Sequence, residues 1–406
     1  MRICIRIALL LITSSTLFSQ DGIQQTLQLL DNDLEKISKV GLIKGYGVAI
    51  VSKDSTLFAK GYGLSDVESG TPYTINTLQN IGSVSKTLIG VALLKAQEMG
   101  KLNLNDPINK HLDFEVINPS YKNDPILIWH LATHTGTIND TGLYDKKAYY
   151  LINKNDLSSE AIKGQSEEFQ TLDNKVTMKD YLENFLSTDG IWYRKKNFVK
   201  KKPGTKYEYS NVGATLAAQV LEEATEMSYD EFTQQYILTP LRMKSSGWSF
   251  DTIDKNQHSK LYNDRSQELP NYSLVTYPDG GLITNLMDFS AYLTELMKGY
   301  YGEGTLLKKE SYTTIFDERL PKKTSPKKAN SYDDEFNSGI FMGYTPKGYL
   351  GHTGSDPGIS SFMFFDPELK IGHIIMLNTS LYGDAVDQQL IPILGAIRAT
   401  LYAWDF

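Results

Sequence analysis

Ser83 and Lys86 have types and a spacing that could do chemistry, within the string IGSVSKT at residues 81–87. Residues three apart share one face of a helix, so the hydroxyl and the amine can meet. The pattern that follows, to Met99, is apolar on nearly every side, which predicts a buried helix. In a dry setting, desolvation lowers the pKa of a lysine and lets its neutral form accept a proton from a serine. The pair therefore predicts a nucleophilic serine, close to a helix N-terminus that favours negative charge.

A Ser-x-x-Lys pattern alone is weak evidence for a catalytic serine. The chain has a second copy, Ser325 to Lys328, in a loop rich in Pro and Lys with no helical pattern behind it. An isolated match most often marks an ordinary helix start with a solvated lysine. Further elements must support the first copy.

Tyr209 and Asn211 form a second candidate group, followed by an apolar helical pattern at residues 214–221. The phenol could relay protons between the serine, the lysine and a leaving group. The Asn211 amide could bind a carbonyl of the substrate. Because the same Tyr-x-Asn pattern recurs at Tyr121 in a polar loop, a lone match indicates no more than a surface tyrosine.

The stretch His352-Thr353-Gly354-Ser355 lies between two predicted strands. An edge strand here would present a hydroxyl, an imidazole and backbone N–H groups to a substrate. The N–H groups of Ser355 and Ser83 could together hold the oxyanion of a tetrahedral intermediate. His134-Thr135-Gly136 repeats the tripeptide after a helical pattern, and we assign that copy a packing role.

Two further patterns have simpler interpretations. His130 and His134 have the spacing of two zinc ligands on a helix, but no glutamate lies between them and no third ligand is evident. Packing is favoured, and no metal is predicted. A basic cluster at Arg194, Lys195, Lys196 and residues 200–202 could meet an anionic substrate, although a solvated loop is favoured.

The first residues predict export. Arg2 and Arg6 flank the start of an apolar run at residues 7–12, followed by small and polar residues, which is the layout of a secretory signal peptide at residues 1–19. The run is too short for a permanent membrane helix, so a periplasmic or secreted protein without a stable membrane anchor is expected. The only cysteine, Cys4, precedes the apolar run, which disfavours lipid anchoring and leaves no thiol in the mature chain.

Composition limits the partners. The 406 residues are 41% hydrophobic with a net charge of −7, enough to build a sizeable core and too acidic for a nucleic-acid-binding surface. A small-molecule or peptide substrate is the expected partner. The sequence makes no prediction of oligomeric state.

The periodicity predicts an α/β (α+β) fold. We expect an amphipathic helix over residues 23–37, a hairpin over 47–64, strands at 340–342, 349–351, 360–365 and 373–377, and a last helix over about 384–402. Strands at both chain ends imply one antiparallel sheet covered by the first and last helices, the sheet region comprising about 20–100 and 298–406. Residues 101–297 would form a helical lobe, including the polar stretch 140–179, for which little structure is predicted. A site is expected between these parts.

The three motifs occur in the order and approximate spacing of the serine β-lactamase and penicillin-binding-protein (DD-peptidase) superfamily, and the chain resembles its class C-like branch. The resemblance extends over most of residues 20–406, through LNLNDP at 102–107, IWHLATHT at 128–135 and PDGGL at 278–282. It implies a β-lactamase/DD-peptidase-like fold.

By this resemblance Ser83 is the nucleophile, Lys86 its activating partner, and Tyr209 the general base or acid. The resemblance places the substrate-binding and oxyanion groups at Asn211, His352, Thr353, Gly354, and the N–H groups of Ser83 and Ser355. Whether Lys86 or Tyr209 takes the first proton stays open, and the two are expected to titrate as a coupled pair. No cofactor is implied.

The chain departs from the family at two motifs. Many related β-lactamases have a lysine at the position of His352, and an imidazole that is mostly neutral at pH 7 would hold a substrate carboxylate less firmly. Efficient β-lactam hydrolysis is therefore not the first expectation. The serine usual between Thr135 and Gly136 is also absent, which affects the geometry of that loop.

The sequence favours an exported serine hydrolase that cleaves an amide or ester, such as a D-amino-acid peptide, a β-lactam or a small ester, through an acyl-enzyme on Ser83. The alternative is a non-hydrolysing penicillin-binding protein or cell-wall sensor with the same site. A third possibility, a metallohydrolase using His130 and His134, predicts loss of activity with chelators.

Overall fold

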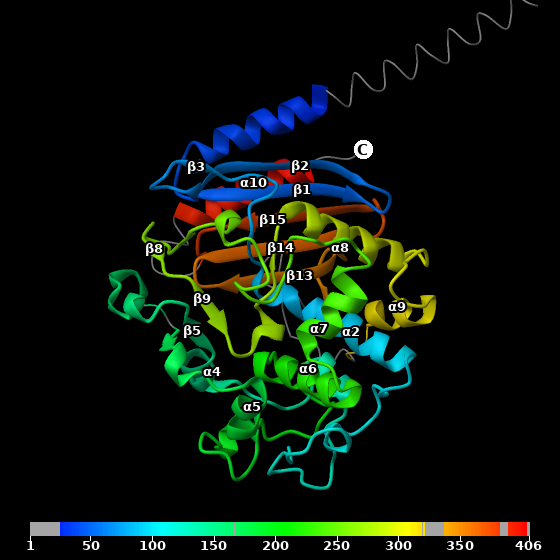
Figure 1. Ribbon diagram of the computed structural model, residues 1–406. Coiled ribbons are helices and arrows are strands. Elements are labelled where there is room, and N and C mark those ends of the chain that lie inside the picture. Colours follow the sequence, from blue (N-terminus) through cyan, green and yellow to red (C-terminus); the bar gives the residue numbers. More distant parts are fainter. Residues whose placement is uncertain are drawn as a thin grey trace, which may run out of the picture.

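The two ends of the chain build one antiparallel sheet of eight strands (Figure 1). Their order across the sheet is β11-β12-β13-β14-β15-β1-β2-β3. Their bounds are β1 (Gly45–Ser52), β2 (Thr56–Asp66), β3 (Thr71–Pro72), β11 (Asn337–Ser338), β12 (Gly343–Tyr344), β13 (Leu350–Asp356), β14 (Ile359–Asp366) and β15 (Ile371–Leu377). In the central pairing Val48 of β1 lies opposite Ile375 of β15, which joins the first hairpin to the last. The predicted sheet and its mixed α and β fold are confirmed.

This computed structural model describes residues 25–163, 165, 167–318, 320, 337–381 and 389–403. The predicted signal peptide, the second Ser-x-x-Lys copy and the first residues of the predicted last helix lie outside these ranges. No helix in the described ranges is both long and apolar enough to cross a bilayer.

The remaining helices are α2 (Lys86–Glu98), α3 (Ile128–Ala132), α4 (Thr141–Lys147), α5 (Met178–Leu186), α6 (Asn211–Thr225), α7 (Tyr229–Thr233), α8 (Leu286–Tyr300), α9 (Lys309–Phe316) and α10 (Ile391–Tyr402), with a further helix over 25–38. Short strands pair as β4 (Gln79–Asn80) with β10 (Ile283–Thr284), β5 (Tyr149–Leu151) with β6 (Gln170–Thr171) and β9 (Tyr272–Leu274), and β7 (Leu261–Tyr262) with β8 (Glu268–Leu269). The polar stretch 140–179 therefore has more regular structure than the sequence indicates.

The terminal helices cover one face of the sheet, as predicted. Successive side chains of a strand point to opposite faces, and in β1 Val48 and Ile50 pack in one cluster with Leu34 of helix 25–38 and Ile397 of α10. The alternate residue Ala49 belongs to the larger cluster on the other face, where α8 packs against β1 and β15. The boundary predicted at about residue 298 places most of α8 in the helical lobe. In the structure α8 instead packs against the sheet.

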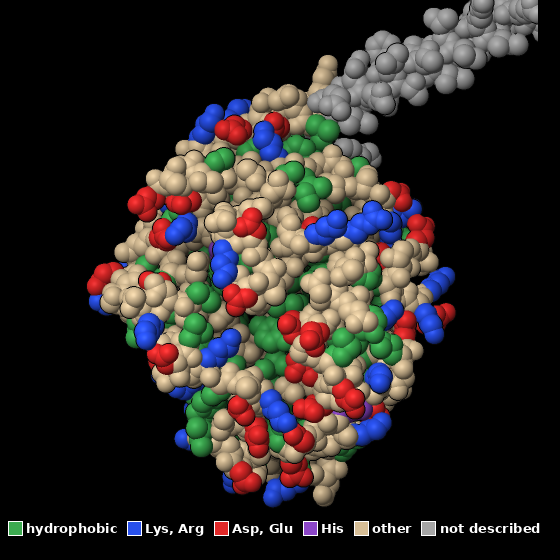
Figure 2. Space-filling model, in the orientation of Figure 1, with side chains coloured by type: hydrophobic (Ala, Val, Ile, Leu, Met, Phe, Trp, Pro, Cys, Tyr) green, Lys and Arg blue, Asp and Glu red, His purple; other side chains and the backbone are tan. Residues whose placement is uncertain are grey.

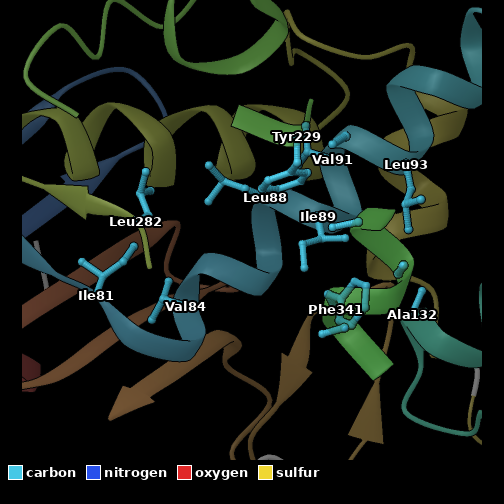
Figure 3. Packing of buried hydrophobic residues seen from close by; sticks show 14 of the residues in the cluster. Ile81, Val84, Leu88, Ile89, Val91, Leu93, Ala132, Tyr229, Leu282 and Phe341 are labelled. Atoms are coloured by element: carbon cyan, nitrogen blue, oxygen red, sulfur yellow. The ribbon is translucent and has the colours of Figure 1, made fainter. Parts of the chain in front are cut away.

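Helix α2 runs through the middle of the larger cluster (Figure 3). Leu88, Ile89 and Leu93 are fully buried, as a helix that is apolar on all sides requires. A 3₁₀ turn, η1 (Gly82–Ser85), precedes it, so the α-helix begins at Lys86 rather than at Ser83.

The predicted strand at residues 340–342 is wrong. These residues form a bend between β11 and β12 in which Phe341 has a φ of +49°. The N–H of Phe341 donates to the Ala132 carbonyl of α3, and that of Ile340 to the Ile315 carbonyl of α9. Phe341 and Ala132 lie together in Figure 3. A short buried apolar run has no period that distinguishes a strand from a packed bend.

Candidate functional site

The Ser83 hydroxyl lies beside the Lys86 amine, as the spacing predicts. Lys86 Nζ donates hydrogen bonds of 2.9 Å to Ser83 Oγ and 2.6 Å to the Asp279 carbonyl oxygen. Lys86 is fully buried, whereas Ser83 is partly exposed. In the 3₁₀ turn η1, residues three apart align along the axis, which brings the two side chains together. The amine is thus withdrawn from water behind a hydroxyl on the surface.

Tyr209 meets this pair from a stretch more than a hundred residues away. Lys86 Nζ lies 5.2 Å from the centre of the Tyr209 ring. Tyr209 is 36% exposed, so part of the residue is in contact with solvent. The first two motifs therefore lie together, with the Tyr209 ring beside the Ser83 and Lys86 pair.

Asp140 fixes the loop that carries Tyr209, and sequence reasoning missed it. Its carboxylate accepts hydrogen bonds from Ser210 Oγ at 2.5 Å, Asn211 N at 2.7 Å and Val212 N at 3.1 Å. An anion at a helix N-terminus satisfies unpaired N–H groups and complements the dipole of α6. No sequence signal links an acid in a polar stretch to a helix 70 residues later.

His134, for which the sequence predicts a packing role, packs against the loop that carries Tyr209. Its ring lies 4.4 Å from the Tyr209 ring, centre to centre, and its Nδ1 lies 3.2 Å from the Ser210 N–H that donates to it. Burial lowers the pKa of His134 well below its usual range, and the charge of Lys86 adds to this. A neutral imidazole therefore supports one face of the Tyr209 ring.

Strand β13 lies directly against η1. A Cβ on Gly354 would lie 2.0 Å from the Ile81 carbonyl oxygen, and one on Gly82 would lie 2.8 Å from Ser355 N. Glycine at both positions permits this approach, which places the Ser355 N–H next to the residue that precedes Ser83. That the Ser83 and Ser355 N–H groups act together as oxyanion donors stays a prediction.

The other strand residues lie where an edge of the sheet faces the site. Strand β12 pairs with β13 only at Leu350 and Gly351, so the later residues lie beyond it. Thr353 is partly exposed and Ser355 is exposed. His352 is buried, with its ring 6.3 Å from the Tyr209 ring. Its role in substrate binding stays a prediction, as do those of Asn211, Thr353 and Gly354.

A buried carboxyl group behind Lys86 was not predicted as part of the site. Asp279 ends the 3₁₀ turn η9 (Tyr277–Asp279), and its backbone carbonyl accepts from Lys86. Its carboxylate accepts hydrogen bonds from the Tyr144 hydroxyl at 3.0 Å and the Thr215 hydroxyl at 2.9 Å. Asp279 thereby ties Lys86 to α4 and α6.

A second buried carboxyl group, that of Asp356, ends the strand that carries the His-Thr-Gly-Ser motif. It accepts a 2.6 Å hydrogen bond from the Tyr149 hydroxyl. A Cβ on Gly280 would lie 2.9 Å from Asp356 Oδ2, so this carboxyl group lies against the residue next to Asp279. The two acids come from segments 77 positions apart, and their proximity has no sequence signal.

Burial affects the protonation of both acids. Burial raises the pKa of Asp279 to about 6 and that of Asp356 to about 8, while Lys86 opposes both shifts. The charge of Asp279 further raises the pKa of Asp356. Both carboxyl groups therefore keep a proton to higher pH than a free aspartate does.

The two-histidine metal hypothesis finds no support in this geometry. His130 Nδ1 accepts from the Leu127 N–H at 3.0 Å, and α3 ends at Ala132, before His134. His134, with a φ of +54°, therefore does not extend the helix face of His130. Among the described residues, no three His, Cys, Asp or Glu side chains form a group that could hold a metal ion.

Solved structures share this fold. The octameric penicillin-binding protein homologue from Pyrococcus abyssi aligns with 93% of this chain and 78% of its own, with a TM-score of 0.71 and 22% identity. The D-amino acid amidase from Ochrobactrum anthropi aligns with 92% of this chain and 98% of its own, with a TM-score of 0.65 and 19% identity. The fold is thus that of the penicillin-binding-protein and β-lactamase class.

A family model described as Beta-lactamase matches residues 30–393, and the chain belongs to this family. Among curated relatives, protein flp from Staphylococcus aureus is 24% identical over 366 residues, which cover 89% of this chain. The chain spans 64% of the length of that relative. The predicted family and fold are confirmed.

Proposed function

We propose that this protein is a serine hydrolase that cleaves an amide or ester through an acyl-enzyme on Ser83. The 2.9 Å hydrogen bond between the buried Lys86 amine and the partly exposed Ser83 hydroxyl is the observation that carries the proposal. Acyl transfer needs a nucleophile that is hydrogen-bonded to a group able to accept its proton and to return it.

In the proposed reaction Ser83 Oγ attacks the substrate carbonyl carbon and gives its proton to the coupled Lys86 and Tyr209 pair. The N–H groups of Ser83 and Ser355 stabilise the resulting oxyanion. The intermediate collapses, the bond to the amine or alcohol breaks, and the pair returns the proton to that leaving group. Water then attacks the acyl-enzyme by the same path and releases an acid and free Ser83.

D-amino-acid amides and peptides, or small esters, are the substrates that we propose. The solved relative named as a D-amino acid amidase supports this class. His352 at the position where many relatives have a lysine makes a β-lactam a weaker candidate, because a buried imidazole offers less positive charge to a carboxylate. The basic and apolar start of the chain supports export to the periplasm or medium.

Replacing Ser83 with alanine tests the proposal. We expect Ser83→Ala to lose fluorophosphonate labelling and to lower turnover of D-amino-acid amides and p-nitrophenyl esters by about a thousandfold or more, because the covalent step is removed. Ser325→Ala, in the second Ser-x-x-Lys copy, is the matched control and should retain wild-type rates. Turnover that survives in Ser83→Ala would exclude the mechanism.

The same labelling separates a hydrolase from a sensor. A hydrolase releases the acyl group, so a fluorescent penicillin or ester should label Ser83 only transiently while product accumulates. Stable stoichiometric labelling without product would instead indicate a non-hydrolysing penicillin-binding protein.

A further inference from the structure

Asp279 contacts the Lys86 amine directly through its backbone. Its carbonyl oxygen accepts the 2.6 Å hydrogen bond from Lys86 Nζ, and the same amine donates to Ser83 Oγ at 2.9 Å. Both Asp279 and Lys86 are buried. A single hydrogen bond therefore joins Asp279 to the amine that holds the Ser83 hydroxyl.

The Asp279 carboxylate lies close to the same amine, because its carbon is only three covalent bonds from the backbone carbonyl carbon. Its oxygens accept hydrogen bonds from the Tyr144 hydroxyl at 3.0 Å and the Thr215 hydroxyl at 2.9 Å. Hydroxyl donors satisfy these oxygens and leave the charge in place. The positive charge that acts on this carboxylate is that of Lys86.

The charges of Asp279 and Lys86 act on each other. Burial raises the pKa of Asp279 to about 6, and the charge of Lys86 opposes this increase. The carboxylate is thus mostly ionised above pH 6, and by the same interaction it favours the protonated amine over the neutral amine. Because a protonated amine cannot accept the proton of Ser83, the carboxylate affects the pH at which Ser83 becomes reactive.

Two other buried acids lie within the electrostatic range of Lys86, namely Asp140 before α4 and Asp356 at the end of β13. Asp140 accepts from three donors at the N-terminus of α6, and Asp356 accepts from the Tyr149 hydroxyl. Asp279 differs from both because its own backbone bonds to the amine. The position of the amine and a charge beside it thus depend on one residue.

The other titratable groups around the amine include aromatic rings. The Tyr209 ring lies 5.2 Å from Lys86 Nζ, and the His352 ring lies 6.3 Å from the Tyr209 ring. His134 is held neutral, since burial lowers its pKa well below the usual range. On the face drawn in Figure 2, described surface charges of both signs are interspersed. Solvent screens such exposed charges more than buried ones, so the buried acids have the stronger effect on the amine.

We propose that Asp279 is a positioning residue: its backbone carbonyl holds the Lys86 amine beside Ser83, and its buried carboxylate sets the pH above which Ser83 becomes reactive. The proposal rests on the proposed function and specifies how pH controls that site. Loss of the carboxylate would move the onset of Ser83 reactivity to lower pH. The direction is the same whether Lys86 or Tyr209 takes the serine proton, because a nearby negative charge disfavours the loss of a proton from either group.

The substitution Asp279→Asn tests this role. Asparagine keeps the backbone carbonyl and an oxygen that can accept from the Tyr144 and Thr215 hydroxyls, but it carries no charge. The rate of fluorophosphonate labelling of Ser83, measured from pH 5 to 10, gives the midpoint of its rise with pH. We expect this midpoint to fall by about one unit, which is the size of shift that one nearby charge causes. A lower plateau with an unchanged midpoint would mean that Asp279 only packs, and would overturn the proposal.

The second variant, Asp279→Ala, separates charge from packing. Alanine also keeps the backbone carbonyl and removes the charge, but it leaves the Tyr144 and Thr215 hydroxyls without this acceptor. A charge effect lowers the midpoint in both variants. A midpoint that falls in only one of two folded variants would reflect local packing and would reject the proposal.

Asp288→Asn is the matched control. Asp288 is a partly buried acid of α8 that accepts from the Ser246 hydroxyl and from the Ser245 N–H, each at 2.9 Å. Neither partner is a predicted site residue. The control should retain the wild-type midpoint even where its stability falls. The same shift in Asp288→Asn would show that the effect does not come from the charge of Asp279.

Failure of the proposed function has a different signature. If fluorophosphonate does not label Ser83 in the wild type, the ¹³Cε chemical shift of Lys86 in lysine-labelled protein, assigned by its loss in Lys86→Met, reports the charge of the amine directly. The titration of this signal should still move to lower pH in Asp279→Asn. Identical titrations of the wild type and Asp279→Asn would overturn the role of Asp279.

Discussion

Deep burial raises the pKa of Asp356 although the charge of Lys86 opposes the shift, and this makes the stability of the protein depend on pH. Its pKa is raised to about 8 in the folded protein from a usual 3.8. Below about pH 4 the group is protonated in the folded and the unfolded chain alike. As pH rises to 8 the unfolded chain releases the proton while the folded protein retains it, so stability is lost across this window.

The substitution Asp356→Asn should remove that loss. Asparagine cannot ionise, yet its oxygen can still accept from the Tyr149 hydroxyl. Relative to the wild type, the free energy of unfolding of the variant should therefore increase between pH 5 and 8 by at least about 1 kcal/mol. Urea unfolding at both pH values measures this.

Asp189→Asn, at an exposed position, is the control and should follow the wild type. If the pH dependence of Asp356→Asn equals that of the wild type, the carboxyl group is ionised in the folded protein across this range and its pKa is not raised.

At the scale of elements, the N-terminus of α6 positions Tyr209, to which we assign a proton-transfer role. Asp140 accepts from three donors there, and asparagine offers one acceptor oxygen and no charge. We expect Asp140→Asn to destabilise the protein by about 1–2 kcal/mol and to slow fluorophosphonate labelling of Ser83 about tenfold through displacement of Tyr209. Labelling of folded protein at a fixed pH measures the second effect.

A control substitution at another helix N-cap distinguishes the displacement of Tyr209 from a general loss of stability. Ser228 caps α7 through a hydrogen bond to the Glu231 N–H, and α7 carries no predicted site residue. Ser228→Ala should lower stability and leave labelling unchanged. Wild-type labelling by Asp140→Asn would mean that Tyr209 does not depend on the carboxylate.

For the whole molecule, the sheet depends on helices from both chain ends on one face and on α8 on the other. Ile397 of α10 is fully buried in the cluster shared with helix 25–38 and β1. Ile397→Ala should destabilise the protein by about 2–5 kcal/mol through lost burial and a residual cavity. Ile391→Ala, at the exposed start of the same helix, should change stability by less than about 0.5 kcal/mol. Equal effects in urea unfolding would contradict the packing of α10.

Local patterns in the sequence determine much of this protein. The period of the apolar residues predicts the first hairpin, the last two strands and the buried α2, and a spacing of three brings Lys86 to Ser83. These features depend on neighbours along the chain, whose geometry the backbone restricts. The order of three motifs also indicates that Tyr209 and β13 belong to the same site.

Only the tertiary structure places Asp140 under α6, His134 on the Tyr209 ring, and Asp279 beside Asp356. Each contact joins segments distant in sequence, and its existence depends on how the sheet and helices pack together rather than on any local period. The bend at residues 340–342 has the same cause, since its backbone bonds to α3 and α9 replace the expected strand pairing. Buried polar groups form hydrogen bonds with whichever partners the tertiary packing brings near them. A single sequence does not show which partners those are.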